Sequence, residues 1–308
     1  MKRGTVIKST GKWYVVKTPD GEYFDCRIRG KFRTAGIKTT NPLAVGDEVS
    51  FEPEDDERGV IQEIHDRKNY IIRKSVNLSK RAHIVAANVD VAFLVVTIKE
   101  PDTSFGFIDR FLVTAEAYHI PTVIVLNKVD RFNEEDRERA DKLIEIYSEI
   151  GYECLETSVP EKHNIDKLKE LLKDKTSVVS GHSGVGKSSL LNAVQPGLKL
   201  KTADVSDSHH KGQHTTTFAE MHELKFGGYI IDTPGIKGLG IVDVPKEELS
   251  HYFVEMRNLL PHCKFHNCVH INEPGCAVKD ALAAELIAES RYKSYWNMYH
   301  NDDENPYR

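Results

Sequence analysis

TSVVSGHSGVGKSS, residues 176–189, is the stretch that decides the fold. A β-branched run leads into a glycine, four spacers and Gly-Lys-Ser, which predicts a strand, a tight turn and the start of a helix. Glycines in such a turn let backbone N–H groups point inward around a triphosphate. Lys187 would then reach the outer phosphates, and the Ser188 hydroxyl would take a place on Mg²⁺. The alternative is a plain glycine-rich helix cap; the candidate phosphate-binding residues are Gly181, His182, Ser183, Gly184, Val185, Gly186, Lys187, Ser188 and Ser189.

Length and composition limit what the rest of the chain can be. At 308 residues it is too long for one typical core, so we expect two or three domains. No apolar run approaches the roughly 18 residues of a membrane helix, and the start, MKRGTVIKS, has no apolar signal segment. We therefore expect a cytoplasmic protein with no membrane partner. Five cysteines, three of them clustered after residue 262, favour a metal site over a disulfide framework.

Residues 1–68 predict a small closed β-barrel of the OB-fold kind, with strands at Thr5–Ser9, Trp13–Thr18, Glu22–Arg29, Asp47–Glu54 and Val60–His65. The net charge of the chain is −5, yet residues 1–46 carry ten Lys or Arg against three acids, and residues 67–81 carry six against none. A basic barrel with aromatic side chains suits RNA binding. The alternative is a barrel that only docks against its neighbouring domain. By alternation, about half of the barrel aromatics should face the core; they are Trp13, Tyr14, Tyr23, Phe24 and Phe32.

From residue 69 to residue 240, strands alternate with helices, which predicts a mostly parallel sheet covered on both faces. Ligands bind such sheets at the carboxyl ends of the strands. The expected strands are Val91–Ile98, Thr122–Leu126, Glu153–Thr157, Val178–Ser180, His222–Phe226 and Tyr229–Asp232, and the expected helices are Ile108–His119, Glu134–Ile150, Ile165–Leu172 and Ser188–Val194.

Residues 241–308 show no strand pattern, and they hold the cysteine cluster and a helical stretch, Ala277–Tyr299. We expect the aromatics of that stretch to pack on the metal-bearing loop; an RNA-facing surface is the alternative. The chain is thus expected to be multidomain, with a β-barrel, an α/β phosphate-loop domain and a helical metal-binding domain.

A second motif, Asn127-Lys128-Val129-Asp130, ends a buried strand. The Asp130 carboxylate can accept hydrogen bonds from the ring N–H and the exocyclic amine of guanine, a pair of donors that adenine lacks. Asn127 would orient the loop and the base edge, and the Lys128 stem would lie along the base plane. One strand later, the backbone N–H of Ser158 could meet the guanine carbonyl oxygen. Beside a phosphate loop, this motif predicts GTP and GDP as ligands and disfavours an ATP-driven RNA remodeller.

Two further segments complete the expected phosphate site. Asp232-Thr233-Pro234-Gly235 follows a strand, so Asp232 would hold Mg²⁺ through water and the Gly235 N–H would sense the γ-phosphate. Thr216 lies in the polar segment 202–218 and would complete the Mg²⁺ shell when triphosphate is bound.

These motifs occur in an unusual order, because the base-reading residues precede the phosphate loop. Joining the ends of an ordinary small GTPase and cutting it after its second switch gives this order, so we expect a circular permutation. With a basic barrel before it and a cysteine tail after it, the chain resembles the bacterial ribosome small-subunit-dependent GTPases, the RsgA family, also called YjeQ or YloQ. The resemblance covers nearly the whole chain; its motifs here are Asn127 to Asp130, Gly181 to Ser189, His214 to Thr217, Asp232 to Gly235 and Cys263-x₄-Cys268-x-His270-x₅-Cys276.

The resemblance implies an OB-fold, GTP hydrolysis stimulated by the small ribosomal subunit, contacts with its rRNA, and a late role in maturing that subunit. We expect a monomer. The alternative function is a GTP-dependent RNA clamp or checkpoint in which hydrolysis only resets binding. Gln213 departs from the family, which often has Arg there, and Gly184 stands where potassium-activated relatives place Asn. The second departure predicts no stimulation by potassium.

Three cysteines and a histidine within fourteen residues can close the tetrahedral shell that structural zinc prefers. His262 and His266 compete for the fourth place, but the family spacing favours His270. One structural Zn²⁺ per chain would then be held by Cys263, Cys268, His270 and Cys276, and its binding would contribute to the folding of the tail. The alternative is reduced thiols buried in a helical tail.

Hydrolysis needs a group that orients water, and the sequence offers one candidate. Many GTPases have Gln after the Asp-x-x-Gly segment, but Ile236 stands there in this chain. His214 is the nearest residue that could orient or deprotonate water, once RNA orders its loop. The alternative is a group supplied by the ribosome.

Overall fold

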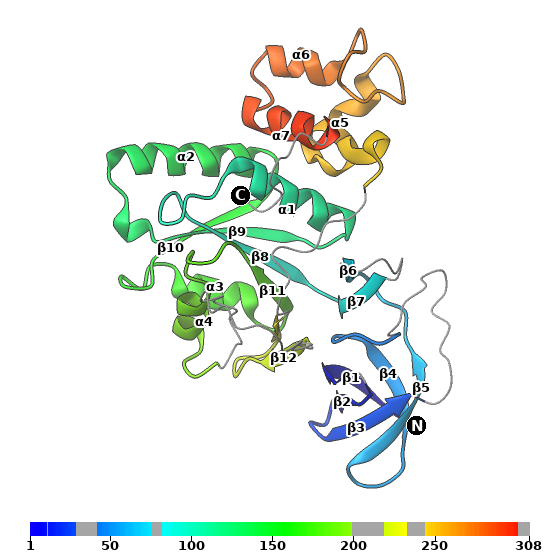
Figure 1. Cartoon of the computed structure of the whole chain (residues 1–308). Coiled ribbons are helices and arrows are strands. Elements are labelled where there is room, and N and C mark those ends of the chain that lie inside the picture. The colour runs from blue at the N-terminus through cyan, green and yellow to red at the C-terminus, as the bar shows by residue number, and fades with distance from the viewer. Residues whose placement is uncertain (11, 29–41, 75–81, 199–218, 233–243, 301–308) are drawn as a thin grey trace, which may run out of the picture.

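The computed structural model describes residues 1–10, 12–28, 42–74, 82–198, 219–232 and 244–300. Along the chain it forms a β-barrel, a central α/β sheet and a helical tail, and the tail and barrel lie at different sides of the central sheet (Figure 1). The predicted multidomain architecture is therefore confirmed. Of the helices in the described ranges, none combines the length and the apolar character that crossing a bilayer needs.

The barrel closes through five strands, which are β1 (Lys2–Ser9), β2 (Tyr14–Lys17), β3 (Tyr23–Ile28), β4 (Glu48–Pro53) and β5 (Arg58–Ile64). Strand β1 pairs with both β2 and β4, while β3 pairs with β2 and, in parallel, with β5. Because β4 and β5 also pair, each of these five strands has two neighbours within the barrel. This closed Greek-key order is that of an OB-fold, as predicted.

The barrel aromatics divide between core and surface, as alternation predicts. Tyr14 and Phe24 are 2% and 3% exposed, and the Phe24 ring packs 5.0 Å from that of Phe51. Trp13 and Tyr23 are 40% and 52% exposed. Phe32 lies outside the described residues.

A short hairpin that sequence did not predict joins the barrel to the central sheet. It consists of β6 (Tyr70–Lys74) and β7 (Ala82–Ala87), which pair only with each other among the described strands. The barrel loop before β4 packs on its end so closely that a Cβ on Gly46 (φ +90°) would lie 2.0 Å from the Ala87 carbonyl oxygen. The hairpin therefore fixes the barrel to the domain that follows.

The central sheet has the strand order β10-β9-β8-β11-β13-β12, in which all strands are parallel except β12. Its elements are β8 (Val91–Val96), α1 (Phe105–Ala117), β9 (Thr122–Asn127), η1 (Val129–Arg131), α2 (Glu134–Glu149), β10 (Glu153–Thr157), α3 (Ile165–Leu172), β11 (Thr176–Ser180), α4 (Lys187–Val194), β12 (Glu220–Glu223) and β13 (Tyr229–Asp232). Alternate residues of β8 face opposite cores: one contains side chains of α1 and α2, the other side chains of α3 and α4. The predicted two-faced sheet is thus confirmed.

The strand that enters the phosphate loop lies in the middle of this sheet. Strand β11 pairs with β8 on one side and β13 on the other, although β8, β9 and β10 all precede it in the chain. The strands that lead to the base-reading residues therefore precede β11 in the chain, and all of them lie on the same side of β11 in the sheet. This is the arrangement expected of a circularly permuted sheet.

A narrow seam joins the barrel to the far edge of the central sheet. Strand β1 pairs with β12 through Lys8 and Glu220, which also form a 3.0 Å ion pair. Beside them Lys17 lies 2.6 Å from Glu223. Burial alone would lower the pKa of Lys17, but the hydrogen bonds to Glu223 and Tyr229 raise it above its usual value. Through this seam the two sheets become one of eleven strands.

The tail is helical, with η2 (Lys246–Tyr252), α5 (Val254–Leu259), η3 (Leu260–His262), α6 (Ala277–Ala283) and α7 (Glu289–His300). Sequence predicted a helical stretch, Ala277–Tyr299, and the structure divides this stretch into the two helices α6 and α7. The chain turns between α6 and α7, where Glu285 adopts φ +58°, and Leu286 is left 79% exposed. Tyr295 of α7 is fully buried in the core that also contains two of the clustered cysteines, so the predicted packing of aromatics on the metal-bearing loop is confirmed for this side chain.

Candidate functional site

The phosphate loop connects β11 to α4 at the carboxyl edge of the sheet, and two of its glycines leave no room for a side chain. A Cβ on Gly181 (φ +144°) would lie 2.2 Å from the Val95 carbonyl oxygen. A Cβ on Gly186 (φ +96°) would lie 2.4 Å from Nδ2 of Asn127. Both positions also require the left-handed backbone that glycine tolerates best. Gly186 is the N-cap of α4, so the backbone N–H groups of the first turn of this helix face the loop.

Side chains of the loop hold it in a defined shape. Nζ of Lys187 donates to the carbonyl oxygens of Gly181 and His182 at 2.8 and 2.7 Å, so the lysine spans the loop from within. The His182 ring stacks on the Phe107 ring of α1, with the ring centroids 3.8 Å apart. A positive charge and a row of backbone donors thus share one small concave turn, which is the arrangement that binds phosphate groups.

Asn127 joins the base-reading loop to the phosphate loop. Its Nδ2 donates to the Val185 carbonyl oxygen at 2.9 Å, and its Oδ1 accepts from the Thr157 hydroxyl at 3.0 Å. The side chain is only 2% exposed, so these bonds are shielded from water. Three segments that lie far apart in the sequence therefore meet at one point. Sequence reasoning gave Thr157 no role of its own, although its place at the end of a strand beside the motif was a usable signal.

The Asp130 carboxylate is oriented by the residue that follows β10. The Ser158 hydroxyl donates to Asp130 Oδ1 at 2.7 Å. The Ser158 backbone N–H, which sequence suggested for the guanine carbonyl, instead donates to the His163 carbonyl oxygen at 3.3 Å. In this structure Ser158 therefore acts on the base-reading loop through its side chain.

Lys128 is held beside the same edge with a left-handed backbone (φ +67°). Its Nζ donates to the Glu100 carbonyl oxygen at 2.5 Å, in the loop that precedes α1. Burial, together with the nearby Arg131, lowers the pKa of Lys128. Sequence reasoning missed the Glu100 contact because the two residues belong to different loops.

Three predicted site residues, His214, Thr216 and Gly235, lie outside the described residues. Asp232 is the last residue of β13, which pairs in parallel with β11, so its backbone lies on the sheet edge that carries the phosphate loop. Ser188 and Ser189 lie in the first turn of α4, and Val129 begins the short helix η1.

In the tail, the predicted metal ligands come together. One ligand atom from each of Cys263, Cys268, His270 and Cys276 lies within 4.8 Å of the other three. Nδ1 of His270 is 3.3 Å from the Cys276 sulfur and 3.7 Å from the Cys263 sulfur, so this nitrogen faces the cluster. A tetrahedral zinc ion with Zn–S bonds of about 2.3 Å places its sulfurs about 3.8 Å apart. The four residues therefore fit a tetrahedral metal ion with only small adjustment.

The loop that carries these ligands is fixed by its neighbours. The Glu273 carboxylate accepts hydrogen bonds from the backbone N–H groups of Val269 and Ile271 at 2.8 and 2.9 Å. Burial would raise the pKa of Glu273, but these amides lower it. The Tyr292 hydroxyl of α7 donates to the His270 carbonyl oxygen at 2.8 Å. Burial raises the pKa of Cys268 to about 12, so a metal must displace protons to bind the thiolates.

A parallel sheet whose middle strand enters a glycine-rich phosphate loop, tied to an Asn-Lys-x-Asp loop from an earlier strand, defines a circularly permuted GTPase. Residues 64–242 match the RsgA GTPase family, and residues 3–61 match the RsgA N-terminal domain. The chain belongs to the RsgA family, which confirms the resemblance inferred from its motifs.

Several known proteins are similar to this chain over nearly its whole length. The small ribosomal subunit biogenesis GTPase RsgA of Christiangramia forsetii is 54% identical, with 98% of this chain and 97% of the relative covered. The protein of the same name from Flavobacterium psychrophilum is 55% identical, with 98% and 93% covered. The crystal structure of YjeQ from Thermotoga maritima has a TM-score of 0.82 at 41% identity and covers 99% of both chains. YloQ, described as a circularly permuted GTPase, has a TM-score of 0.77 at 33% identity, with 99% and 96% covered.

Proposed function

We propose that this protein hydrolyses GTP to GDP and phosphate and acts in the late maturation of the small ribosomal subunit, which stimulates its turnover. The observation that carries the proposal is the Asn127 side chain, which connects the base-reading loop to the Val185 carbonyl of the phosphate loop. A guanine edge held at Asp130 would thereby be kept at a fixed distance from the phosphates. The small ribosomal subunit is proposed as the partner because the relatives are named small ribosomal subunit biogenesis GTPases.

In this proposal the nucleotide contacts follow the sequence motifs. Asn127 to Asp130 and Ser158 meet the guanine, residues 181–189 hold the phosphates, and Gly235 senses the γ-phosphate. The hydroxyls of Ser188 and Thr216 would hold Mg²⁺, with Asp232 acting through water. The metal supplies charge neutralisation at the phosphates.

His214 is proposed to orient the attacking water, because Ile236 after the Asp-x-x-Gly segment has no polar group.

Zinc is the metal proposed for the tail. Three thiols and an imidazole are soft ligands that favour zinc over magnesium or calcium. Since all four ligand positions come from the protein, no position is left for substrate, and the role is structural. The core around Phe253 and Tyr295 then depends on the ion for part of its stability.

The barrel is proposed to bind rRNA, and the barrel and the tail together to bind the small subunit. Exposed Trp13 and Tyr23 offer ring faces on a barrel whose sequence is basic, which suits stacking on unpaired bases. We assign residues 1–68 to this RNA-binding domain, 69–240 to the GTPase domain and 241–308 to the zinc-binding domain. The protein is proposed to work as a cytoplasmic monomer.

Two measurements test the function. Multiple-turnover GTP hydrolysis is followed with and without purified small ribosomal subunits, and a rise of at least tenfold is expected. Co-sedimentation with subunits is then compared in GDP and in a non-hydrolysable GTP analogue, and binding that depends on the nucleotide is expected. Turnover that subunits leave unchanged, with GTP-dependent binding intact, would indicate an RNA clamp instead. Loss of both effects would refute the proposal.

A further inference from the structure

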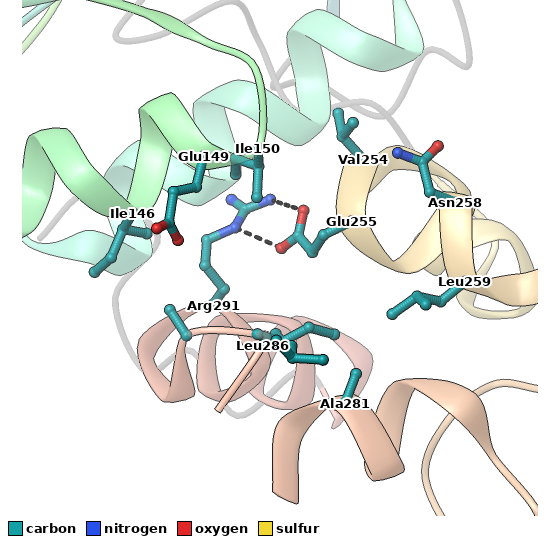
Figure 2. A pocket seen from close by; sticks show the side chains of 12 residues that line it. Ile146, Glu149, Ile150, Val254, Glu255, Asn258, Leu259, Ala281, Leu286 and Arg291 are labelled. Carbon is teal, nitrogen blue, oxygen red and sulfur yellow. Dashed lines mark hydrogen bonds and ion pairs between the residues drawn. The ribbon is translucent and has the colours of Figure 1, made fainter. Parts of the chain in front are cut away.

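A small hollow opens at the junction of the GTPase domain and the tail (Figure 2). It measures about 290 Å³ and lies between the end of α2, helix α5 and the turn from α6 to α7. Much of its wall is apolar, from Ile146, Ile150, Val254, Leu259 and Ile287. Pockets for cofactors and drug-sized ligands usually measure about 300–1,000 Å³. At the lower limit of that range, this one has room for one or two side chains of a partner.

The cation at the base of the hollow is already neutralised. Arg291 is 1% exposed, and its Nε and one terminal nitrogen lie 2.8 and 3.0 Å from the two carboxylate oxygens of Glu255, as Figure 2 shows. Its other terminal nitrogen donates to Asp109 Oδ1 of α1 at 2.7 Å. One guanidinium therefore faces two carboxylates, and it offers no charge to an anion from outside.

The mouth of the hollow is acidic. Glu149 lines it and is exposed, and Glu285 and Glu289, also exposed, flank the lining residues of the α6–α7 turn. Residues 143–156 and 280–290 contain no Lys or Arg, while the exposed Lys142 and Lys279 lie just before these two segments, on α2 and α6. Three exposed carboxylates at the mouth thus outnumber the two nearest exposed lysines of these segments. A phosphate backbone would be repelled here, whereas a positively charged partner would be attracted.

The same mouth presents an apolar side chain to solvent. Leu286, at the turn between α6 and α7, is 79% exposed and lines the hollow. On the neighbouring helix α5, the basic residue Arg257 is paired with Glu116 at 2.9 Å and does not offset the acidic mouth. An apolar hollow with an acidic border suits a segment that carries an apolar side chain next to Lys or Arg.

We propose that this hollow docks a basic protein segment of the small ribosomal subunit, and not its RNA. The inference rests on the proposed function, since it requires the subunit as partner. Proteins of a ribosome lie among phosphates and carry basic segments for that reason. Because the wall comes from α2 on one side and α5 to α7 on the other, one docked side chain would contact the GTPase domain and the zinc-bearing tail together.

The test places a photo-crosslinker, benzoylphenylalanine, at position 286 of the full chain, and at Tyr23 of the barrel as a reference. Each protein is bound to purified small subunits in a GTP analogue and irradiated. The position 286 probe should give a protease-sensitive, nuclease-resistant adduct that maps to a Lys/Arg-rich peptide. An adduct with RNA alone, or none at 286 while position 23 reacts, overturns the inference. If unmodified protein does not co-sediment with subunits, the proposed function itself fails.

A charge reversal gives an independent readout. Glu149→Lys should weaken subunit binding about fivefold at low salt, with a smaller effect as salt rises. Glu138→Lys, an equally exposed position of α2 about 16 Å away along the helix axis, is the matched control and should change affinity less than twofold. Zinc content and basal GTP turnover should be unchanged in both variants. Equal effects of the two reversals would contradict a local docking site.

Discussion

Asn127→Ala should loosen the phosphate loop even when no nucleotide is bound. The Asn127 side chain bonds the Val185 carbonyl and the Thr157 hydroxyl, and it is 2% exposed. After truncation, the Thr157 hydroxyl can still turn to the Leu126 carbonyl oxygen, 3.5 Å away. The Val185 carbonyl has lost its side-chain donor. A buried acceptor left unpaired costs about 1–3 kcal/mol, and with the space left by the amide we expect a loss of about 2–3 kcal/mol.

Hydrogen exchange read by mass spectrometry is the suitable assay. The two tryptophans, Trp13 and Trp296, lie in the barrel and the tail, so their fluorescence would report on other domains. Peptides that cover residues 181–191 should exchange at least tenfold faster in nucleotide-free Asn127→Ala protein, because 1.4 kcal/mol corresponds to a factor of ten. Affinity for GDP should fall by a similar factor or more.

The matched control is Asn133→Ala, which removes the same side chain from the start of α2. Asn133 accepts a hydrogen bond from the Asp136 N–H at 2.8 Å, and within the described part of the chain its hydrogen bonds stay at the start of α2. Its loss should therefore cost about 1 kcal/mol without faster exchange at residues 181–191. If loop exchange is the same in Asn127→Ala and wild-type protein, the connection between the two loops does not stabilise the site and the reasoning is refuted.

Four further outcomes are expected. Asp130→Asn should shift preference from guanine to xanthine nucleotides in a competition assay, and retained GTP preference would argue against the base assignment. Cys276→Ser should lower bound zinc well below one ion per chain and make the tail sensitive to proteolysis, while GDP affinity stays within twofold. His214→Ala should reduce subunit-stimulated turnover about 100-fold with GTP binding intact; unchanged turnover would exclude it as the catalytic group. Because Gly184 replaces the Asn of potassium-activated relatives, exchanging NaCl for KCl should leave the rate unchanged, and a several-fold rise would contradict this.

Much of the fold could be predicted because its elements have strong local patterns. Strand β10 and helix α3 have the bounds that sequence predicted, since each combines a clear period with flanking turn residues. The β6–β7 hairpin was missed, because the segment Ala-His-Ile-Val-Ala-Ala shows no alternation and its place depends on the barrel loop at Gly46. The α6–α7 turn was also missed, because Ala-Glu-Leu-Ile-Ala-Glu favours helix locally and tertiary packing overrides that preference.

In the candidate site, too, sequence predicted some features and missed others. Spacing alone identifies the phosphate loop, the Asn-Lys-x-Asp loop and the cysteine cluster, because those chemistries need close neighbours in sequence. The contacts that shape them come from elsewhere: Val95 beside Gly181, and Phe107 under His182. The Ser158 amide closes a local turn with His163, a contact that sequence did not predict, and its contact with guanine stays a prediction. No spacing rule encodes the contacts of Val95 and Phe107, since they depend on how the strands and helices are arranged around the sheet.

Because of the seam between the barrel and strand β12, a change in ionic strength should affect this protein in two ways. Its two lysine–glutamate pairs include carboxylates that are 29% and 51% exposed, so added salt weakens them. Added salt also releases RNA from any basic surface. A plot of RNA affinity against salt concentration would therefore combine two effects: counterion release from the RNA, and weaker attachment of the barrel to the central sheet. The slope of this plot would then overestimate the number of phosphates that the protein contacts. Lys17→Met, which removes the pair whose lysine is the better buried (15% against 43% exposed), would separate the two contributions.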